Sequence, residues 1–163
     1  DVESAPGEGA TFRVHLPVAT KAPVAVTQAA PAGISTGTET VLLVEDERAT
    51  RNLVARMLQV AGYTVLPAAD ADEAMALMQQ HAGGIDLLLT DVVLPGTNGG
   101  ALAAQVQAAS PRTAVLFMSG YLDDRLEGAV SPDASNLIAK PFTDAALVNR
   151  VRERLGCRPG AES

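Results

Sequence analysis

Five short apolar runs, alternating with segments of helical periodicity, constrain the fold of this chain more than any other feature of its sequence. The runs occupy residues 41–44, 63–66, 87–90, 114–118 and 137–139, and polar or turn residues bound each of them. A short apolar run of this kind is typical of a strand buried on both faces. Such strands form parallel sheets, whose right-handed helical crossovers cover both faces. The sequence therefore predicts an α/β fold, a doubly wound five-stranded parallel sheet of strand order 2-1-3-4-5 with helices on both faces.

Four further segments carry apolar residues at helical spacing, over 48–61, 70–81, 98–109 and 143–155. The periodic residues of the first segment are Leu53, Val54, Met57, Leu58 and Ala61. Asp70 or Asp72 is the expected N-cap of the second helix, and Asn98 is that of the third. The segment 121–130 makes only a poor helix, because Gly128 interrupts it.

The composition excludes several classes of partner. The chain has 163 residues, of which 47% are hydrophobic, enough for one domain of ordinary size and an appendage. Its 12 Lys and Arg against 19 Asp and Glu give a net charge of −7, the wrong sign for binding nucleic acid. No apolar run approaches 18 residues, so this fragment is expected to make no membrane contact. The single cysteine rules out an internal disulfide, and a cytoplasmic location is expected.

The chain divides by composition into an appendage, a linker and one domain. In residues 1–20 a glycine-rich turn precedes Phe12, Val14 and Leu16, which alternate as in one half-buried strand. A single strand cannot bury its own face, so it is expected either to dock on something in a longer parent chain or to be loose in this one. Residues 21–38 have the composition of a flexible linker. The periodic domain is expected over 39–157, followed by a tail at 158–163.

Side chains that could act in catalysis or metal binding follow four of the five predicted strands. Glu45 and Asp46 follow the first, Asp91 the third, Ser119 the fourth and Lys140 the fifth. Because the carboxyl ends of parallel strands meet at one edge of a sheet, these side chains are expected to line one pocket. Clustered carboxylates repel one another unless a cation lies among them, and Mg²⁺ suits an all-oxygen site. Such a pocket is suited to phosphoryl transfer, with Asp91 as the nucleophile.

Each of these features has an ordinary structural explanation when it is taken alone. The acidic residues 45–47 could complement the N-terminus of the first helix. Ser119 with Gly120 is ordinarily a turn, and a lysine before proline is ordinarily a loop residue. Their occurrence together at successive strand ends favours the functional interpretation.

The motifs of the domain resemble those of the receiver domain of two-component response regulators, which has a flavodoxin-like fold. They are Leu-Val-Glu-Asp-Glu at 43–47, Leu-Thr-Asp-Val-Val-Leu-Pro-Gly at 89–96, Phe-Met-Ser-Gly-Tyr at 117–121 and Lys-Pro-Phe at 140–142. The resemblance implies that the domain accepts a phosphoryl group from a phosphohistidine in a Mg²⁺-dependent reaction. The donor or acceptor is then a histidine kinase or a histidine phosphotransfer domain outside this fragment.

The resemblance also implies a role for each site residue. Asp91 becomes the phospho-accepting aspartate. The implied metal ligands are Glu45, Asp46, Asp91 and the carbonyl group of Val93. Ser119 becomes the hydroxyl that follows the phosphoryl group, and Lys140 the lysine that neutralises its charge. The aromatic residue usual three positions before this lysine is replaced by Leu137, and Tyr121 is the candidate to act in its place.

The appendage carries a second, shorter resemblance. Residues 4–17 resemble the last glycine box and final strand of the ATP-binding domain of sensor histidine kinases. This implies that the chain is the C-terminal receiver of a hybrid sensor histidine kinase and that it lacks the kinase core itself. Whether the receiver passes its phosphate onward or regulates its own kinase is left open by the sequence.

Two other functions compete with this interpretation. A phosphohydrolase of the haloacid dehalogenase type also places an aspartate at a strand end, but it needs a second acid two residues later, where this chain has Val93. A nucleotide-binding module needs a glycine-rich loop after the first strand, and residues 45–48 contain no glycine.

Overall fold

The computed structural model describes residues 1–7, 9–13, 15, 37–81, 84–120 and 135–156. The chain forms two compact units, Asp1–Gly33 and Ile34–Ser163. Among the described residues, no helix is both long enough and apolar enough to cross a membrane. The predicted poor helix at 121–130 lies outside the described residues.

The described part of the first unit contains a β-hairpin, whereas the sequence suggested one strand. β1 (Val2–Ala5) pairs antiparallel with β2 (Gly9–Phe12), because the intervening turn, with Gly7 and Gly9 at positive φ, folds the chain back on itself. Val2 and Phe12 lie opposite each other and are 63% and 72% exposed. Val14 and Leu16, predicted to continue the strand, lie outside the described residues. A two-stranded hairpin has no covered face of its own, and whether it docks on another part of a longer chain stays a prediction.

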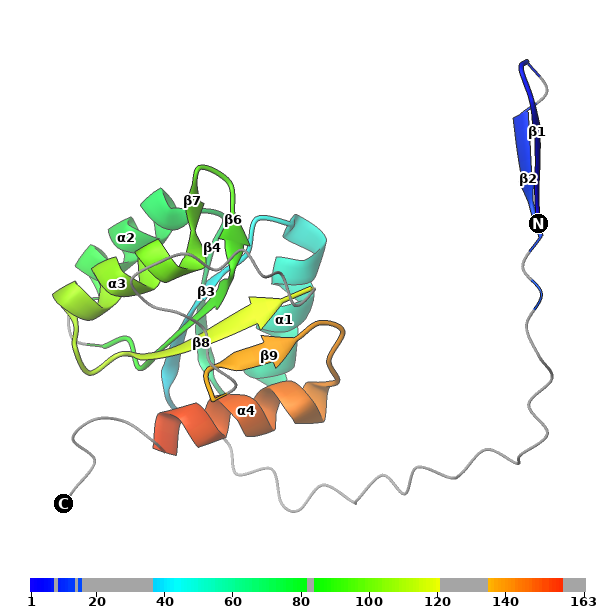
Figure 1. Ribbon diagram of the computed structural model, residues 1–163. Helices are drawn as coiled ribbons and strands as arrows, with labels where there is room; N and C mark the ends of the chain where they lie inside the picture. The colour runs from blue at the N-terminus through cyan, green and yellow to red at the C-terminus, as the bar shows by residue number, and fades with distance from the viewer. Residues whose placement is uncertain (8, 14, 16–36, 82–83, 121–134, 157–163) are drawn as a thin grey trace, which may run out of the picture. The chain divides into compact units, whose positions relative to one another are not determined.

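The second unit contains the predicted parallel sheet. Its strands are β3 (Thr40–Val44), β4 (Thr64–Ala68), β5 (Leu87–Asp91), β8 (Ala114–Ser119) and β9 (Leu137–Ala139). All neighbouring strands are parallel, and their order is β4-β3-β5-β8-β9 (Figure 1). This confirms the predicted order 2-1-3-4-5. β4 continues past its predicted end through Pro67, which an edge strand tolerates because one side of it carries no ladder.

Among the described residues, four helices cover the two faces of this sheet, and each lies in a segment predicted to be helical. They are α1 (Arg48–Val60), α2 (Ala71–Gln80), α3 (Gly99–Ala109) and α4 (Asp144–Gly156). α1 and α4 pack on one face and α2 and α3 on the other (Figure 1). Of the two candidate caps for α2, Asp70 is the one used, since its carboxylate accepts a hydrogen bond from the backbone N–H of Glu73 at 2.9 Å. Asn98 caps α3 in the same way, through the N–H of Ala101 at 2.7 Å.

The central strands are apolar on both sides because each side meets a helical layer. In β3, Val41 and Leu43 belong to the core under α1 and α4, whereas Leu42 and Val44 belong to the core under α2 and α3. All four side chains are fully buried. Leu53, although part of the periodic pattern, is 56% exposed, because it lies about 100° around the helix from the buried Val54.

The loop after β5 has more structure than the sequence indicated. β6 (Val93–Leu94) and β7 (Thr97–Asn98) form a small antiparallel pair, with Gly96 at a φ of 78° in the turn between them. This pair leads directly into the capped N-terminus of α3, so the loop that follows Asp91 is held at both ends.

Candidate functional site

The candidate site lies at the edge of the sheet where the strands of the second unit end. Asp91 is the last residue of β5 and Ser119 the last of β8. Glu45 and Asp46 directly follow β3, and Lys140 directly follows β9. The sheet order places β3, β5, β8 and β9 side by side, so the predicted residues come to one edge.

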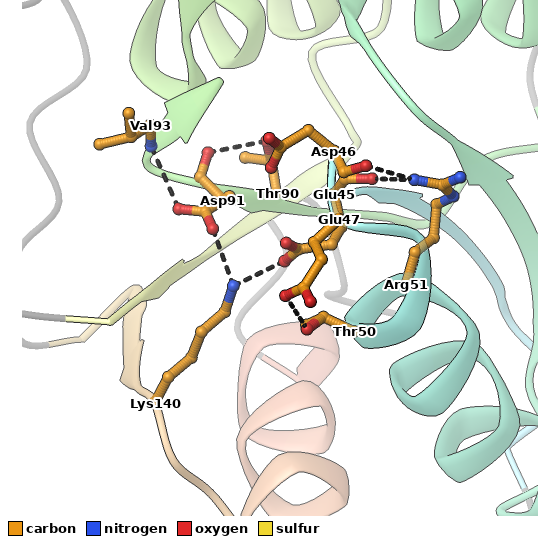
Figure 2. Close-up of polar contacts among 9 residues, drawn as sticks. All are labelled: Glu45, Asp46, Glu47, Thr50, Arg51, Thr90, Asp91, Val93 and Lys140. Atoms are coloured by element: carbon orange, nitrogen blue, oxygen red, sulfur yellow. Dashed lines mark hydrogen bonds and ion pairs between the residues drawn. The ribbon is translucent and has the colours of Figure 1, made fainter. Parts of the chain in front are cut away.

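Lys140 joins two of the predicted carboxylates. Its ammonium nitrogen Nζ lies 2.6 Å from Oε2 of Glu45 and 2.7 Å from Oδ2 of Asp91 (Figure 2). The side chain of Glu45 is 3% exposed, and that of Asp91 is 17% exposed. Asp91 is therefore fixed by an ion pair and still reachable from solvent.

Glu45, Asp46 and Asp91 form what we term the acidic cluster. One carboxylate oxygen of each residue lies within 4.8 Å of one oxygen of each of the other two. Three carboxylates thus face one ammonium group, and the cluster has surplus negative charge. Carboxylate oxygens at this spacing suit a hard divalent cation.

The pKa values of two site residues reflect this surplus. Burial raises the pKa of Glu45 above 4.5, and although Lys140 lowers it, the charges of Asp91 and Asp46 raise it further. Burial lowers the pKa of Lys140, but its hydrogen bonds to Asp91 and Glu45 outweigh that effect and raise the pKa above 10.5. Lys140 therefore stays charged at neutral pH. Burial disfavours the ionised form of Glu45, and a cation bound nearby would favour that form.

The backbone after Asp91 orients its carboxylate. The N–H of Val93 donates to Oδ1 of Asp91 at 3.1 Å, so both carboxylate oxygens have a partner. The N–H of Gly99 donates to the carbonyl of Val92 at 2.8 Å, and a Cβ atom at position 99 would lie 2.2 Å from the carbonyl oxygen of Asp91. Only glycine fits there, and the sequence analysis did not single out Gly99. The pair of glycines directly after the Asn98 cap was the available signal.

The loop between β3 and α1 also contains contacts that the sequence did not reveal. The guanidinium group of Arg51 donates to the carbonyl oxygens of Glu45 and Asp46 at 2.5 and 3.0 Å. Glu47 occupies the N-cap position of α1 without a capping hydrogen bond from its side chain, which instead accepts one from the hydroxyl of Thr50 at 2.7 Å. Simple helix capping therefore does not account for this acidic segment.

Of the other predicted residues, Ser119 and Leu137 are described by the structure. The carbonyl of Ser119 accepts a hydrogen bond from the backbone N–H of Lys140 at 2.6 Å, which ties the ends of β8 and β9 together. Leu137 is partly buried against the core under α2 and α3. Tyr121 lies outside the described residues. The roles given to the Ser119 hydroxyl, the Val93 carbonyl and these two residues stay predictions.

Comparison with known proteins gives the same family from sequence and from structure. A family model described as the response regulator receiver domain matches residues 41–152. The chain is 36% identical to the sensor kinase CckA of Brucella abortus over 162 residues, covering 94% of this chain and 17% of that protein. It is 35% identical to the transcriptional regulatory protein CpxR of Escherichia coli over 113 residues, covering 69% of this chain and 47% of that protein. The chain thus spans less than half the length of either relative.

Solved structures of similar chains have the same fold. The crystal structure of the receiver domain from the hybrid histidine kinase CckA matches with a TM-score of 0.60 and 37% identity, covering 71% of this chain and 98% of that one. A response regulator receiver protein from Sinorhizobium medicae matches with a TM-score of 0.65 and 25% identity, covering 77% of this chain and all of that one.

Proposed function

This chain belongs to the response regulator receiver domain family, and from that premise we propose that Asp91 accepts a phosphoryl group from a phosphohistidine in a phosphorelay. The observation that carries the proposal is the placement of the Asp91 carboxylate. It lies at the end of a buried strand, 2.7 Å from the Lys140 ammonium and within the acidic cluster, and it is accessible to solvent.

The proposed reaction is a displacement at phosphorus. A carboxylate oxygen of Asp91 forms a bond to phosphorus as the phosphorus–nitrogen bond of the donor histidine breaks, and the electron pair leaves with the imidazole. The Lys140 ammonium neutralises charge on the phosphoryl oxygens, and the Ser119 hydroxyl donates a hydrogen bond to one of them. The Val93 N–H holds the attacking carboxylate in a fixed orientation.

The acidic cluster fits a bound Mg²⁺. Glu45, Asp46 and Asp91 supply carboxylate oxygens, and the Val93 carbonyl is the proposed further ligand. When bound, the ion neutralises negative charge on the transferred group. Burial is the main cause of the raised pKa of Glu45, and the charges of Asp91 and Asp46 add to it. A cation bound among the three carboxylates would favour their ionised forms, which supports this assignment.

The affinity for Mg²⁺ should depend on pH through Glu45. Only the ionised carboxylate binds the cation, and the pKa of this group lies above 4.5. As pH falls from 7, Glu45 takes up its proton at a higher pH than a free glutamate does, so the affinity should begin to decline at a higher pH than it would for an unshifted carboxylate. Calorimetric titration with MgCl₂ between pH 7.5 and pH 5 measures this. A Glu45→Gln variant should bind weakly and show a much smaller pH dependence over that interval; unchanged dependence would assign the titration elsewhere.

We further propose that the chain is the C-terminal receiver of a hybrid sensor histidine kinase. The alignment with the CckA sensor kinase covers 94% of the chain, so it extends beyond the receiver match at 41–152. The apolar residues Val2 and Phe12 of the β1–β2 hairpin are exposed. This supports the interpretation of residues 1–20 as the remnant of the final strand of an ATP-binding domain. The linker at 21–38, the receiver at 39–157, the tail at 158–163 and the cytoplasmic location remain part of this proposal. The partner is a histidine kinase or a histidine phosphotransfer domain.

Incubation with Mg²⁺ and a small-molecule phosphodonor tests the proposed function. The intact mass of the protein should rise by one phosphoryl group, which survives acid and is lost in base, and chelation of Mg²⁺ by EDTA should prevent the gain. A phosphohydrolase of the haloacid dehalogenase type, the alternative function, would instead release phosphate continuously. Continuous release without a stable adduct would reject the receiver proposal.

A further inference from the structure

Arg51 lies beside the site among the described residues, and the proposed chemistry gives it no role. It lies near the start of α1, where its own N–H donates to the carbonyl of Glu47 at 2.9 Å. Its guanidinium nitrogen Nη1 contacts two consecutive carbonyl oxygens, those of Glu45 and Asp46. These belong to the two residues whose side chains supply most of the acidic cluster.

The direction of these hydrogen bonds matters for cation binding. Figure 2 shows the Arg51 guanidinium and the Lys140 ammonium on opposite sides of the Glu45–Asp46 backbone. Lys140 bonds to carboxylate oxygens, whereas Arg51 bonds only to the main chain and makes no ion pair with a carboxylate among the described residues. Arg51 thus restrains the loop without occupying any oxygen that a metal ion would use.

The charge of Arg51 and its hydrogen bonds to the main chain lead to opposite predictions for the effect of this residue on cation affinity. A positive charge close to a cation site weakens cation binding, so loss of the charge alone would strengthen it. Loss of a group that orients ligands weakens binding, and removal of such a supporting hydrogen bond typically lowers metal affinity by about 10-fold or more. The two carbonyl contacts favour the second effect, because they fix the peptide groups from which the Glu45 and Asp46 side chains project.

We propose that Arg51 is a positioning residue for cation binding, which holds the β3–α1 loop so that the carboxylates of Glu45 and Asp46 converge with that of Asp91. The inference rests on the proposed function, since it concerns the same acidic cluster. It assigns to Arg51 a contribution to cation binding that acts entirely through backbone carbonyl groups.

Calorimetric titration of the whole chain with MgCl₂, at pH 7.5, tests this inference. Arg51→Met should bind Mg²⁺ about 10-fold more weakly than wild type, although a positive charge has been removed. Arg51→Lys keeps the charge but lacks the guanidinium nitrogen Nη1 that donates to both carbonyl oxygens, so its affinity should fall between the two. The matched control is Arg48→Met, because Arg48 is an exposed residue on the same helix and its side chain has no hydrogen bond to another described residue. Arg48→Met should bind as tightly as wild type or slightly tighter.

A second measurement separates positioning from general stability. Amide hydrogen exchange at 46–48 should be faster in Arg51→Met than in wild type, while exchange in the central strands should be unchanged. Equal or tighter Mg²⁺ binding by Arg51→Met would overturn the inference, as would an equal loss in Arg48→Met. If Arg51→Met does not fold, Arg51→Lys decides, and wild-type affinity in it would overturn the inference. A wild-type chain that binds no Mg²⁺ would overturn the proposed function and this inference with it.

Discussion

Asp91→Asn is expected to abolish phosphoryl uptake from a small-molecule phosphodonor. The amide keeps the size of the side chain, and its oxygen can still accept the hydrogen bond from the Val93 N–H. It is not a nucleophile, so no bond to phosphorus forms. Intact-mass measurement should show no adduct under conditions in which the wild-type chain is largely converted.

The variant also changes the electrostatics of the cluster in a defined direction. The Asp91 charge contributes to the raised pKa of Glu45, so its removal should lower that pKa. Asp70→Asn is the matched control, because it removes one charge from an exposed N-cap and asparagine caps a helix equally well. Asp70→Asn should be phosphorylated like wild type. An adduct on Asp91→Asn protein would place the acceptor at another residue and contradict the proposed function.

Lys140→Met should affect metal binding and phosphoryl transfer in opposite directions. In the wild-type chain the ammonium occupies Oε2 of Glu45 and Oδ2 of Asp91. Removing it frees both oxygens and makes the site more negative, so Mg²⁺ should bind more tightly. Phosphoryl transfer should slow by about 100-fold or more, because one group that stabilises the developing charge is lost.

The two effects are measured by calorimetric titration with MgCl₂ and by the rate of mass gain from the phosphodonor. Both are best measured at pH 8, since loss of Lys140 also removes an interaction that lowers the pKa of Glu45. Lys140→Arg serves as the control, because it keeps the charge but not the geometry of the ammonium. It should bind Mg²⁺ much as wild type does and still transfer slowly. A parallel loss of both properties in Lys140→Met would show that Lys140 supports the fold of the site rather than the chemistry.

The sequence was sufficient to predict the sheet, its order and the edge at which the site lies. The central strands β3, β5 and β8 are apolar on both sides, so their burial is encoded in their own few residues. Parallel pairing with short helical crossovers then leaves few topologies, and in the predicted one the ends of β3, β5, β8 and β9 are neighbours. This is why acids and a lysine far apart in the chain could be assigned to one pocket before any distance was known.

Local sequence patterns predicted less where the arrangement of a segment depends on contacts with residues outside it. The hairpin of β1 and β2 was missed because only the second half of it shows alternation. Leu53 belongs to the periodic pattern of α1, and its exposure follows from which face of the helix meets the sheet. In each case the residues permit more than one arrangement, and a contact elsewhere selects one.

By itself, the sequence determined the architecture and the membership of the site, because hydrophobic periodicity and strand topology act through the backbone. Only the tertiary structure decided how the site residues are held. Lys140 reaches Glu45 across 95 positions of the chain, the pKa of Glu45 rises chiefly through burial, and Gly99 and Arg51 act on main-chain carbonyl groups. These properties depend on distances and solvent exclusion between segments, and such quantities exist only once the segments have packed together.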